Sequence, residues 1–558
     1  MDINKRTIIW IVFSVSLVIL WNNWMVANGN QSMFSMTPPP AKVAPAPVAA
    51  NPAAGLPVAS GATAAATLPG APVAPLAVKT EIVTITTDVF KVSIDTAGGV
   101  IKHLELLKFR DKIDKTKNQV LFDVNQKGTY VAQTGLIGNV AGVTPPNHNT
   151  AFVARPGPRA LDSASELKLV LEAVEGGIKL TKTFTFKRGD YLIGMQHDVT
   201  NMTAAPISPS LYLQLLHHGN EPEGESYFTA SYTGPTMYTS INHYEKLQFK
   251  DIEKLGKAEH TEKANDGWIA MSQHYFVSAF VPPQNVPREI FTKKIEANLY
   301  AIGTLLPLGA IAPGATKSSD VKLYSGPQDE KKLALIAPEL DRVKDYGVLT
   351  VLAKPMFWVM DQIHSLLGNW GWTIIAFTIL IKLLFFPLSA AGYKSMARIK
   401  VVTPKMTAIR EKYKGDPAKM NQATMELYKT EKINPLGGCL PIVVQMPVFI
   451  ALYWVLQASA EMRGAPWLGW ITDLTAPDPY FILPVLYAIS MFITTKLNPA
   501  PADPMQAKMM LFMPLIFSVM FIFFPSGLVL YWVVNNILSI AQQWVITKKF
   551  EDAAAIKK

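Results

Sequence analysis

Six long apolar runs constrain this 558-residue chain more than any other feature of its sequence. Each run is close to the ~17–25 residues that a helix needs to cross the hydrocarbon core of a bilayer. The runs are Ile8–Trp24, Trp372–Leu388, Leu440–Leu456, Tyr480–Thr495, Met510–Phe524 and Leu528–Ile546. They account for a hydrophobic content of 49%, which is high for a chain that only buries a soluble core. The sequence therefore predicts a polytopic α-helical membrane protein with six transmembrane helices.

The distribution of charge orients the predicted helices. Residues 389–438 carry ten Lys and Arg against four Asp and Glu, and the positive-inside tendency places such a loop in the cytoplasm. The loop 461–479 carries one Arg against three Asp and Glu and is expected outside. With six spans, both termini are then cytoplasmic, in agreement with a basic tail over 547–558.

The N-terminal part is predicted to tether the chain. Lys5 and Arg6 precede the first apolar run, Trp21 and Trp24 end it, and no convincing A-x-A cleavage site follows. We therefore expect residues 1–26 to form an uncleaved signal-anchor helix. Residues 27–78 are dominated by Ala, Pro and Val with almost no charge, which predicts a disordered linker.

Residues 79–340 change to alternation with a period of two, as in Phe90-Val92-Ile94 and Leu167-Leu169-Leu171. This pattern predicts one large antiparallel β-sandwich, placed outside the cytoplasm by the charge argument. His217 and His218 are candidate ligands or acid–base groups, but adjacent histidines without nearby carboxylates are usually structural. We assign them no role.

An amphipathic helix is predicted over residues 341–369. Its apolar stripe consists of Met356, Phe357, Met360, Ile363 and Leu367. A stripe of this kind beside a membrane more often lies in the interface than crosses it. The five later spans, residues 370–546, are expected to form a helical core.

The basic loop 389–438 is expected to be a helical hairpin. Asp416 is a suitable N-cap and Pro417 a suitable first residue for its second helix. A solvated loop near anionic lipid explains the charge equally well, but the length and helicity favour docking of an acidic or RNA-containing partner such as the ribosome. The predicted docking residues are Arg398, Lys400, Lys405, Arg410, Lys412 and Lys419.

The chain carries no common catalytic motif. Scanning for G-x-x-x-x-G-K-[ST], H-E-x-x-H, G-x-S-x-G and paired C-x-x-C finds none. Its single cysteine, Cys439, cannot form an intramolecular disulfide. We therefore predict no catalytic residue, no metal site, no cofactor and no enzymatic activity.

Lys382 lies inside the second apolar run, although a charge at the bilayer centre costs about 3 kcal/mol or more. Six residues, or ~9 Å of helix, separate it from Leu388 at the cytoplasmic edge, so its side chain could snorkel there. Other spans also bring amides and hydroxyls, and none brings an acidic residue. This combination favours a hydrated cavity that opens to the cytoplasm.

Seven stretches of the sequence resemble the YidC-type membrane protein insertases of Gram-negative bacteria. Four are NPLGGCLPIVVQMPVFIALYWVL (Asn434–Leu456), DPYFILP (Asp478–Pro484), DPMQAKMMLFMP (Asp503–Pro514) and FPSGLVLYWVVNN (Phe524–Asn536). The others are GNWGWTIIAFTILIKLLFFPL at the second span, and KTFTFKRGDY and DGWIAMSQHYF in the β-domain. The resemblance covers nearly the whole chain outside the Pro/Ala linker.

The resemblance implies a five-helix core in the bacterial inner membrane, enclosing a hydrophilic groove closed toward the periplasm, and a periplasmic β-supersandwich. It implies insertion and folding of nascent membrane proteins, alone or with the Sec translocon. The implied groove residues are Lys382, Thr378, Gln445, Trp532, Asn535 and Asn536. The family usually has Arg where Lys382 stands, and Trp532 replaces a tyrosine that is common in relatives.

Two other classes remain open from the residues alone. A small-solute transporter also needs polar groups at mid-membrane, although the chain shows no repeated halves with matching broken helices. A membrane peptidase could use Lys382 as a base with Ser389 or Ser395, although both serines lie at or beyond the cytoplasmic edge.

Overall fold

The computed structural model describes residues 80–138, 144–220, 232–431, 440–498, 512 and 516–555. All of them belong to one compact unit, Gly55–Lys558. The predicted anchor 1–26 and linker 27–78 lie outside the described residues, as do residues 510, 511 and 513–515 of the fifth apolar run.

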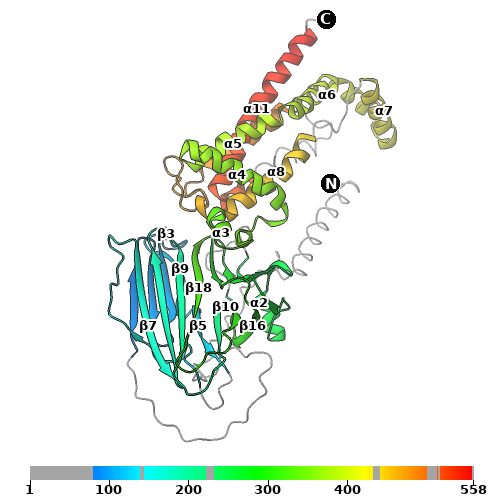
Figure 1. The fold of residues 1–558 in the computed structure, drawn as a ribbon. Helices are drawn as coiled ribbons and strands as arrows, with labels where there is room; N and C mark the ends of the chain where they lie inside the picture. Colours follow the sequence, from blue (N-terminus) through cyan, green and yellow to red (C-terminus); the bar gives the residue numbers. More distant parts are fainter. Residues whose placement is uncertain are drawn as a thin grey trace. The chain divides into compact units, whose positions relative to one another are not determined.

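Two nine-stranded antiparallel sheets form the β-domain (Figure 1). The first sheet has, in spatial order, β1 (Ile82–Thr86), β2 (Phe90–Asp95), β3 (Val100–Arg110), β4 (Asn118–Asn125), β5 (Gly128–Ile137), β10 (Ser210–His218), β17 (Leu299–Pro307), β16 (Arg288–Glu296) and β13 (Lys263–Ala264). The second has β12 (His243–Lys246), β11 (Gly234–Thr239), β14 (Trp268–Ser272), β15 (Phe276–Val281), β18 (Thr316–Pro327), β9 (Leu192–Asn201), β8 (Ile178–Lys187), β7 (Glu166–Glu175) and β6 (Val153–Ala154). The predicted antiparallel β-sandwich is confirmed.

Sequence alternation decides which face of each strand enters the sandwich. Leu167, Leu169 and Leu171 on β7 are buried, and the exposed or half-buried residues stand between them. Because side chains in a strand point to opposite faces in turn, every second residue joins the apolar core. His217 belongs to this interior: it is 2% exposed and stacks on Phe249, which gives it a structural place.

Figure 1 shows helices that follow the β-domain along the chain, and several of them coincide with the predicted spans. The described helices are α2 (Phe249–Leu255), α3 (Glu330–Ile336), α4 (Thr350–Leu367), α5 (Trp370–Leu384), α6 (Phe386–Lys412), α7 (Pro417–Thr430), α8 (Leu440–Ala458), α9 (Ile482–Leu497) and α11 (Ser526–Ala555). Within the described part of the chain, one helix, Ser526–Lys549, is long and apolar enough to cross a membrane. The count becomes two if the bent pair α5 and α6 is one span, and two shorter apolar helices, Gln445–Ala458 and Ile482–Leu497, accompany them. The number of six spans stays a prediction.

The second predicted span is not one straight helix, which corrects the expectation of a run from Trp372 to Leu388. α5 ends at Leu384, and α6 leaves it at an angle of 67°. The break is at Phe385, two residues before Pro387 in the first turn of α6. Proline has no N–H to donate to the carbonyl oxygen four residues before it, here that of Leu383, and its ring clashes with that carbonyl, so α5 cannot continue through it.

Three of the five residues in the predicted stripe of the amphipathic helix face protein, whereas Ile363 is half-buried and Leu367 is 48% exposed. Met356, Phe357 and Met360 of α4 are buried against the core that α5 and α8 share. The opposite side exposes Val351, by 87%, and Trp358, by 62%. If this helix lies in the membrane interface, that second side is the one available to lipid.

A lysine is buried between the two sheets. Lys182 on β8 is 1% exposed, and its Nζ donates to the carbonyl oxygens of Gly98, at 2.6 Å, and Thr134, at 2.7 Å. His197 lies opposite Lys182 in the β8–β9 register and contacts the Thr134 hydroxyl at 2.9 Å. Burial lowers the pKa of Lys182 to about 7 and, with the charge of Lys182, that of His197 to about 3.

This cluster predicts that the β-domain becomes more stable as pH rises. The folded pKa of Lys182 is about 7, against 10.5 in an unfolded chain, so the unfolded state binds more protons between these values. The free energy of unfolding should rise by about 1 kcal/mol from pH 7 to pH 8. His197, and His148, whose pKa burial lowers to about 4, add the same sign below pH 6.5.

Hydrogen exchange of the β8 and β9 amides in the full chain, corrected for the intrinsic exchange rate, measures this dependence. Lys182→Met keeps an unbranched side chain that is one atom shorter and removes its titration, so it should abolish the rise between pH 7 and pH 8. Equal slopes in both proteins would show that Lys182 is not the titrating group.

Candidate functional site

A polar stripe runs along α11 through the helical core. Tyr531, Asn535 and Ser539 stand four residues apart, so they share one face of the helix. α11 begins at Ser526, directly after Pro525, where its first amides bond the preceding loop: Ser526 N–H donates to Ala476 O at 2.8 Å and Gly527 N–H to Leu474 O at 2.9 Å. These bonds satisfy two of the donors that a helix leaves unpaired at its start.

Lys382 reaches this stripe from α5. Its Nζ donates to Ser539 Oγ at 2.7 Å, and Ser539 Oγ donates to the carbonyl oxygen of Asn535 at 2.7 Å. Lys382 is 7% exposed, and no carboxylate among the described residues forms an ion pair with it. The cation is therefore bonded to a neutral hydroxyl group.

Gln445 reaches the same stripe from α8. Its Nε2 donates to the hydroxyl of Tyr531 at 3.3 Å and to the amide oxygen of Asn535. Side chains from α5, α8 and α11 thus form one network, which we call the polar seam: Lys382, Ser539, Asn535, Gln445 and Tyr531. It gathers three of the six predicted groove residues, Lys382, Gln445 and Asn535.

The other three predicted groove residues lie apart from the seam. Asn536 turns toward α9, where its Nδ2 donates to Ser490 Oγ at 3.1 Å. Thr378 is fully buried and donates to the carbonyl oxygen of Ile374, one turn back on its own helix, at 2.6 Å. Trp532 packs on Phe449, with ring centroids 4.8 Å apart, and its buried Nε1–H has no hydrogen-bond partner among the described residues.

The predicted groove residues did not include Ser539, Tyr531 or Ser490, although Ser539 is one of the polar residues of the last span. The first two carried a usable signal, because they stand one turn after and one turn before Asn535. Ser490 carried none, since a single serine in an apolar helix looks the same whether or not it has a polar neighbour.

The predicted docking residues lie on α6 and α7. Five of the six, Arg398, Lys400, Lys405, Lys412 and Lys419, are exposed, and Arg410 is half-buried. Lys405 forms an ion pair with Glu431 at 2.5 Å that ties the two helices together. The predicted N-cap of α7 is confirmed: the Asp416 side chain accepts from the Lys419 amide at 3.1 Å.

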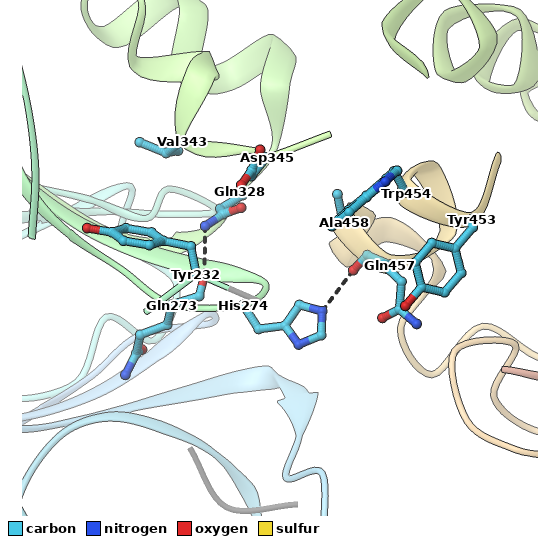
Figure 2. Close-up of a pocket in the computed structure, with 10 residues that line it drawn as sticks. All are labelled: Tyr232, Gln273, His274, Gln328, Val343, Asp345, Tyr453, Trp454, Gln457 and Ala458. Carbon is cyan, nitrogen blue, oxygen red and sulfur yellow. Dashed lines mark hydrogen bonds between the residues drawn. The ribbon is translucent and has the colours of Figure 1, made fainter. Parts of the chain in front are cut away.

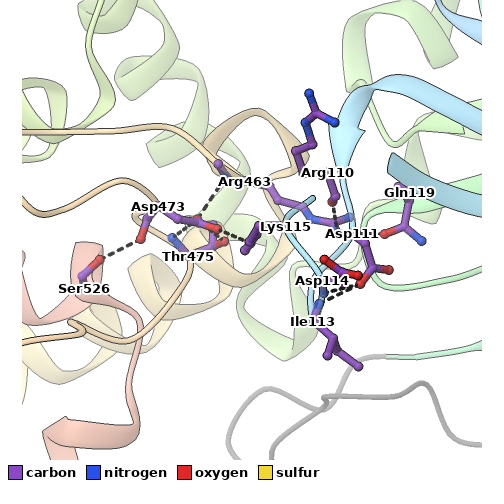
Figure 3. A network of polar contacts seen from close by, with 11 residues as sticks. Arg110, Asp111, Ile113, Asp114, Lys115, Gln119, Arg463, Asp473, Thr475 and Ser526 are labelled. Atoms are coloured by element: carbon purple, nitrogen blue, oxygen red, sulfur yellow. Dashed lines mark hydrogen bonds and ion pairs between the residues drawn. The ribbon is translucent and has the colours of Figure 1, made fainter. Parts of the chain in front are cut away.

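The loop between α8 and α9 is bonded to the β-domain (Figure 3). Arg463 donates to Arg110 O at 2.8 Å and to Gln119 Oε1 at 2.7 Å. Lys115 forms an ion pair with Asp473 at 3.2 Å. Asp473 also accepts from Ser526 Oγ, at 3.0 Å, through its carbonyl oxygen, so this loop links the β-domain to the start of α11.

A pocket of about 90 Å³ lies at the end of α8 beside the β-domain. Figure 2 shows His274 reaching across it to the carbonyl oxygen of Gln457, with the imidazole Nε2 at 2.9 Å. The pocket is large enough for ordered water. Within the described residues, no group of three or more His, Cys, Asp or Glu side chains could hold a metal ion.

Comparisons with known proteins agree with both halves of the chain. Residues 82–359 match the family described as YidC periplasmic domain, and residues 362–553 match 60Kd inner membrane protein. The membrane protein insertase YidC of Janthinobacterium sp. (strain Marseille) and that of Herminiimonas arsenicoxydans are each 59% identical over 568 residues, covering 98% of this chain and 99% of the relative. A solved structure described as an active YidC insertase is 18% identical, covers 83% of this chain and 92% of that chain, and has a TM-score of 0.39.

The class of protein follows from these matches and from the fold. The chain is an inner-membrane protein with a large periplasmic β-sandwich. It belongs to the YidC family of membrane protein insertases.

The seam predicts energetic coupling between Gln445 and Asn535. Replacing one of them by Leu leaves the other buried without its partner, whereas replacing both removes the unpaired groups together. The two single changes should therefore sum to more than the double change, by about 1 kcal/mol. Reversible unfolding of the full chain in detergent or bicelles measures the cycle.

Asn536→Leu is the matched control, because Asn536 bonds Ser490 on α9, whereas Gln445 bonds Tyr531 and Asn535. Its cost should add to that of Gln445→Leu to within about 0.5 kcal/mol. Additive costs for Gln445 and Asn535 themselves would contradict the network.

Proposed function

We propose that the polar seam lines a hydrophilic, cationic groove through which this chain inserts nascent membrane proteins. As a member of the YidC family the protein is a membrane protein insertase, a role in which no covalent bond is made or broken. The observation that carries the groove proposal is the contact between Lys382 and Ser539, at 2.7 Å, which keeps a cation among neutral polar groups. Thr378, Trp532 and Asn536 complete the proposed lining.

The physical need for such a groove is the cost of polar groups in lipid. A nascent membrane protein must move a short polar segment across the hydrocarbon layer, and each unpaired polar group there costs several kcal/mol. Amides and hydroxyls at the positions of Gln445, Asn535 and Ser539 can replace water for that segment. Lys382 attracts its acidic residues, and the apolar helix of the client leaves sideways into lipid.

The position of Lys382 supports the groove over simple snorkelling. A snorkelling lysine extends along its own helix toward the headgroups. Lys382 is instead turned to α11, where its Nζ bonds Ser539. The likeness to insertases along the whole chain supports this function over transport of small solutes or peptide hydrolysis.

We propose that the hairpin of α6 and α7 docks the ribosome on the cytoplasmic side. Its exposed lysines and arginines fit the phosphates of RNA, and its ion pair between Lys405 and Glu431 stiffens the surface that they share. The proposed topology has six spans with both termini in the cytoplasm, and the Sec translocon is a proposed partner for larger clients.

The function is tested by reconstituting the full chain alone with ribosome-made single-span clients that carry zero, one or two acidic residues in the outer tail. Lys382→Ala should impair acidic tails most, Lys382→Arg should preserve insertion, and Lys382→Glu should be worst through like-charge repulsion. The penalty per tail acid should be about 1 kcal/mol, or roughly fivefold in insertion, because a wet groove screens the charges. Protection of the client from protease measures insertion.

Lys394→Ala is the matched control, since Lys394 is an exposed lysine of α6 outside the seam. It should leave the dependence on tail charge unchanged. Equal insertion of all clients by the unmodified protein and by Lys382→Glu would remove Lys382 from the mechanism.

The topology is tested by thiol labelling. In a Cys439→Ser background, single Thr407→Cys and Thr430→Cys substitutions place a thiol on α6 and α7, where both residues are exposed. Impermeant reagents should reach them only from the cytoplasmic side. Labelling from the periplasmic side would overturn the six-span arrangement.

A further inference from the structure

The connection between β3 and β4 is strongly basic. We call residues 108–117 the basic hairpin. Its basic residues, all exposed, are Lys108, Arg110, Lys112, Lys115 and Lys117. Its two acids, Asp111 and Asp114, are half-buried. The surface that this hairpin offers is therefore positive.

The two acids build the turn and leave the lysines outside. Asp111 Oδ1 accepts the amides of Ile113 and Asp114, both at 2.8 Å, and Asp114 Oδ1 accepts the amide of Thr116 at 3.1 Å. These bonds fix the tip, where the Ile113 side chain is 61% exposed (Figure 3). An apolar residue at the tip of a basic loop combines the two features that a lipid surface attracts.

The contacts of the basic hairpin place it at the outer end of a predicted span. Lys115 is 3.2 Å from Asp473, whose carbonyl oxygen accepts from Ser526, the first residue of α11. Under the topology proposed above, this end of α11 meets the periplasmic surface of the membrane. The hairpin therefore lies at the level of the lipid headgroups.

Exposed aromatic side chains mark the same level. Tyr480 and Phe481, just before α9, are 69% and 48% exposed, and Trp372, in the first turn of α5, is 47% exposed. Aromatic residues are enriched where a membrane protein passes from lipid to water. The first residues of α5, α9 and α11 and the basic hairpin thus lie at the same boundary between lipid and water.

We propose that the basic hairpin docks on anionic phospholipid headgroups of the outer leaflet of the inner membrane, with Ile113 inserted among them. Charge complementarity selects the partner, because the hairpin carries five exposed cations against two acids. Lys117 pairs with Asp114 at 3.4 Å and Lys115 with Asp473 at 3.2 Å, and the surface stays net positive after both pairs are counted. The contact steadies the β-domain on the bilayer, beside the start of the helix that carries the polar seam. It rests on the proposed topology but not on the groove.

The test uses the full chain in lipid nanodiscs, with Cys439→Ser and a fluorophore on Ile113→Cys. Quenching by nitroxide attached to lipid headgroups reports proximity to the bilayer. Quenching should be several-fold stronger in bilayers that contain phosphatidylglycerol than in phosphatidylcholine alone. It should weaken as salt is added, since ions screen exposed charges.

Val174→Cys is the matched probe control. Val174 is 58% exposed, and it neighbours Glu175, which bonds Thr150 beside Gly98 at the opposite end of β3, ~30 Å away. It should be quenched little in either lipid. Replacing Lys108 and Lys117 by Gln should reduce quenching at Ile113, whereas the same change at the exposed Lys127 and Lys317 should not.

Three outcomes would overturn the proposal. They are equal quenching at Ile113 and Val174, equal quenching in neutral and anionic bilayers, and shielding of the Ile113 probe only after an acidic protein partner is added. Failure of the cysteine-labelling topology test, by contrast, would remove the placement of the hairpin at the periplasmic surface.

Discussion

Burial of a cation inside an apolar helix is the constraint on which the helical core depends. Lys382 needs hydrogen-bond acceptors that water supplies elsewhere, and Ser539 of α11 supplies one. This contact joins α5 to the face of α11 that carries Tyr531, Asn535 and Ser539. Gln445 of α8 bonds the same face, while Asn536 faces α9 and Trp532 packs on Phe449. The polar groups of α11 thus meet three neighbouring helices.

Strand alternation and helix capping were predictable because both are decided within a few residues. The period-two pattern around Leu169 and the N-cap at Asp416 appear in the fold as expected. The break at Phe385 also has a local cause, which is Pro387. The apolar run continues on both sides of this proline, and for that reason the sequence predicted a single straight helix. The sequence predicted that α4 carries an apolar stripe. It did not predict that Met356, Phe357 and Met360 of this stripe face the protein core, because a stripe of Met and Phe fits a protein core as well as a membrane interface.

The sequence indicates which residue types belong to the candidate site, but it does not indicate which side chains bond one another. A charge or an amide among apolar residues stands out in any sequence, which is why Lys382, Gln445 and Asn535 were found. Their partners are hydroxyl groups, which apolar helices tolerate at many positions. Thr378 and Ser539 both donate to a carbonyl oxygen one turn back on their own helix, and Ser539 also accepts from Lys382 on the helix opposite. That difference arises from helix packing, which no local pattern contains.

Asp473 bonds both the β-domain and the first residue of α11. Its carboxylate binds Lys115 of the β-domain, and its carbonyl oxygen binds Ser526, where α11 begins. The helix that holds the polar seam is therefore anchored at its start to the same loop that holds the β-domain. Two bonds therefore join the basic hairpin to the start of α11. The β-domain is bonded to one end of the helix that carries the polar seam, and the five residues of the seam all belong to α5, α8 and α11.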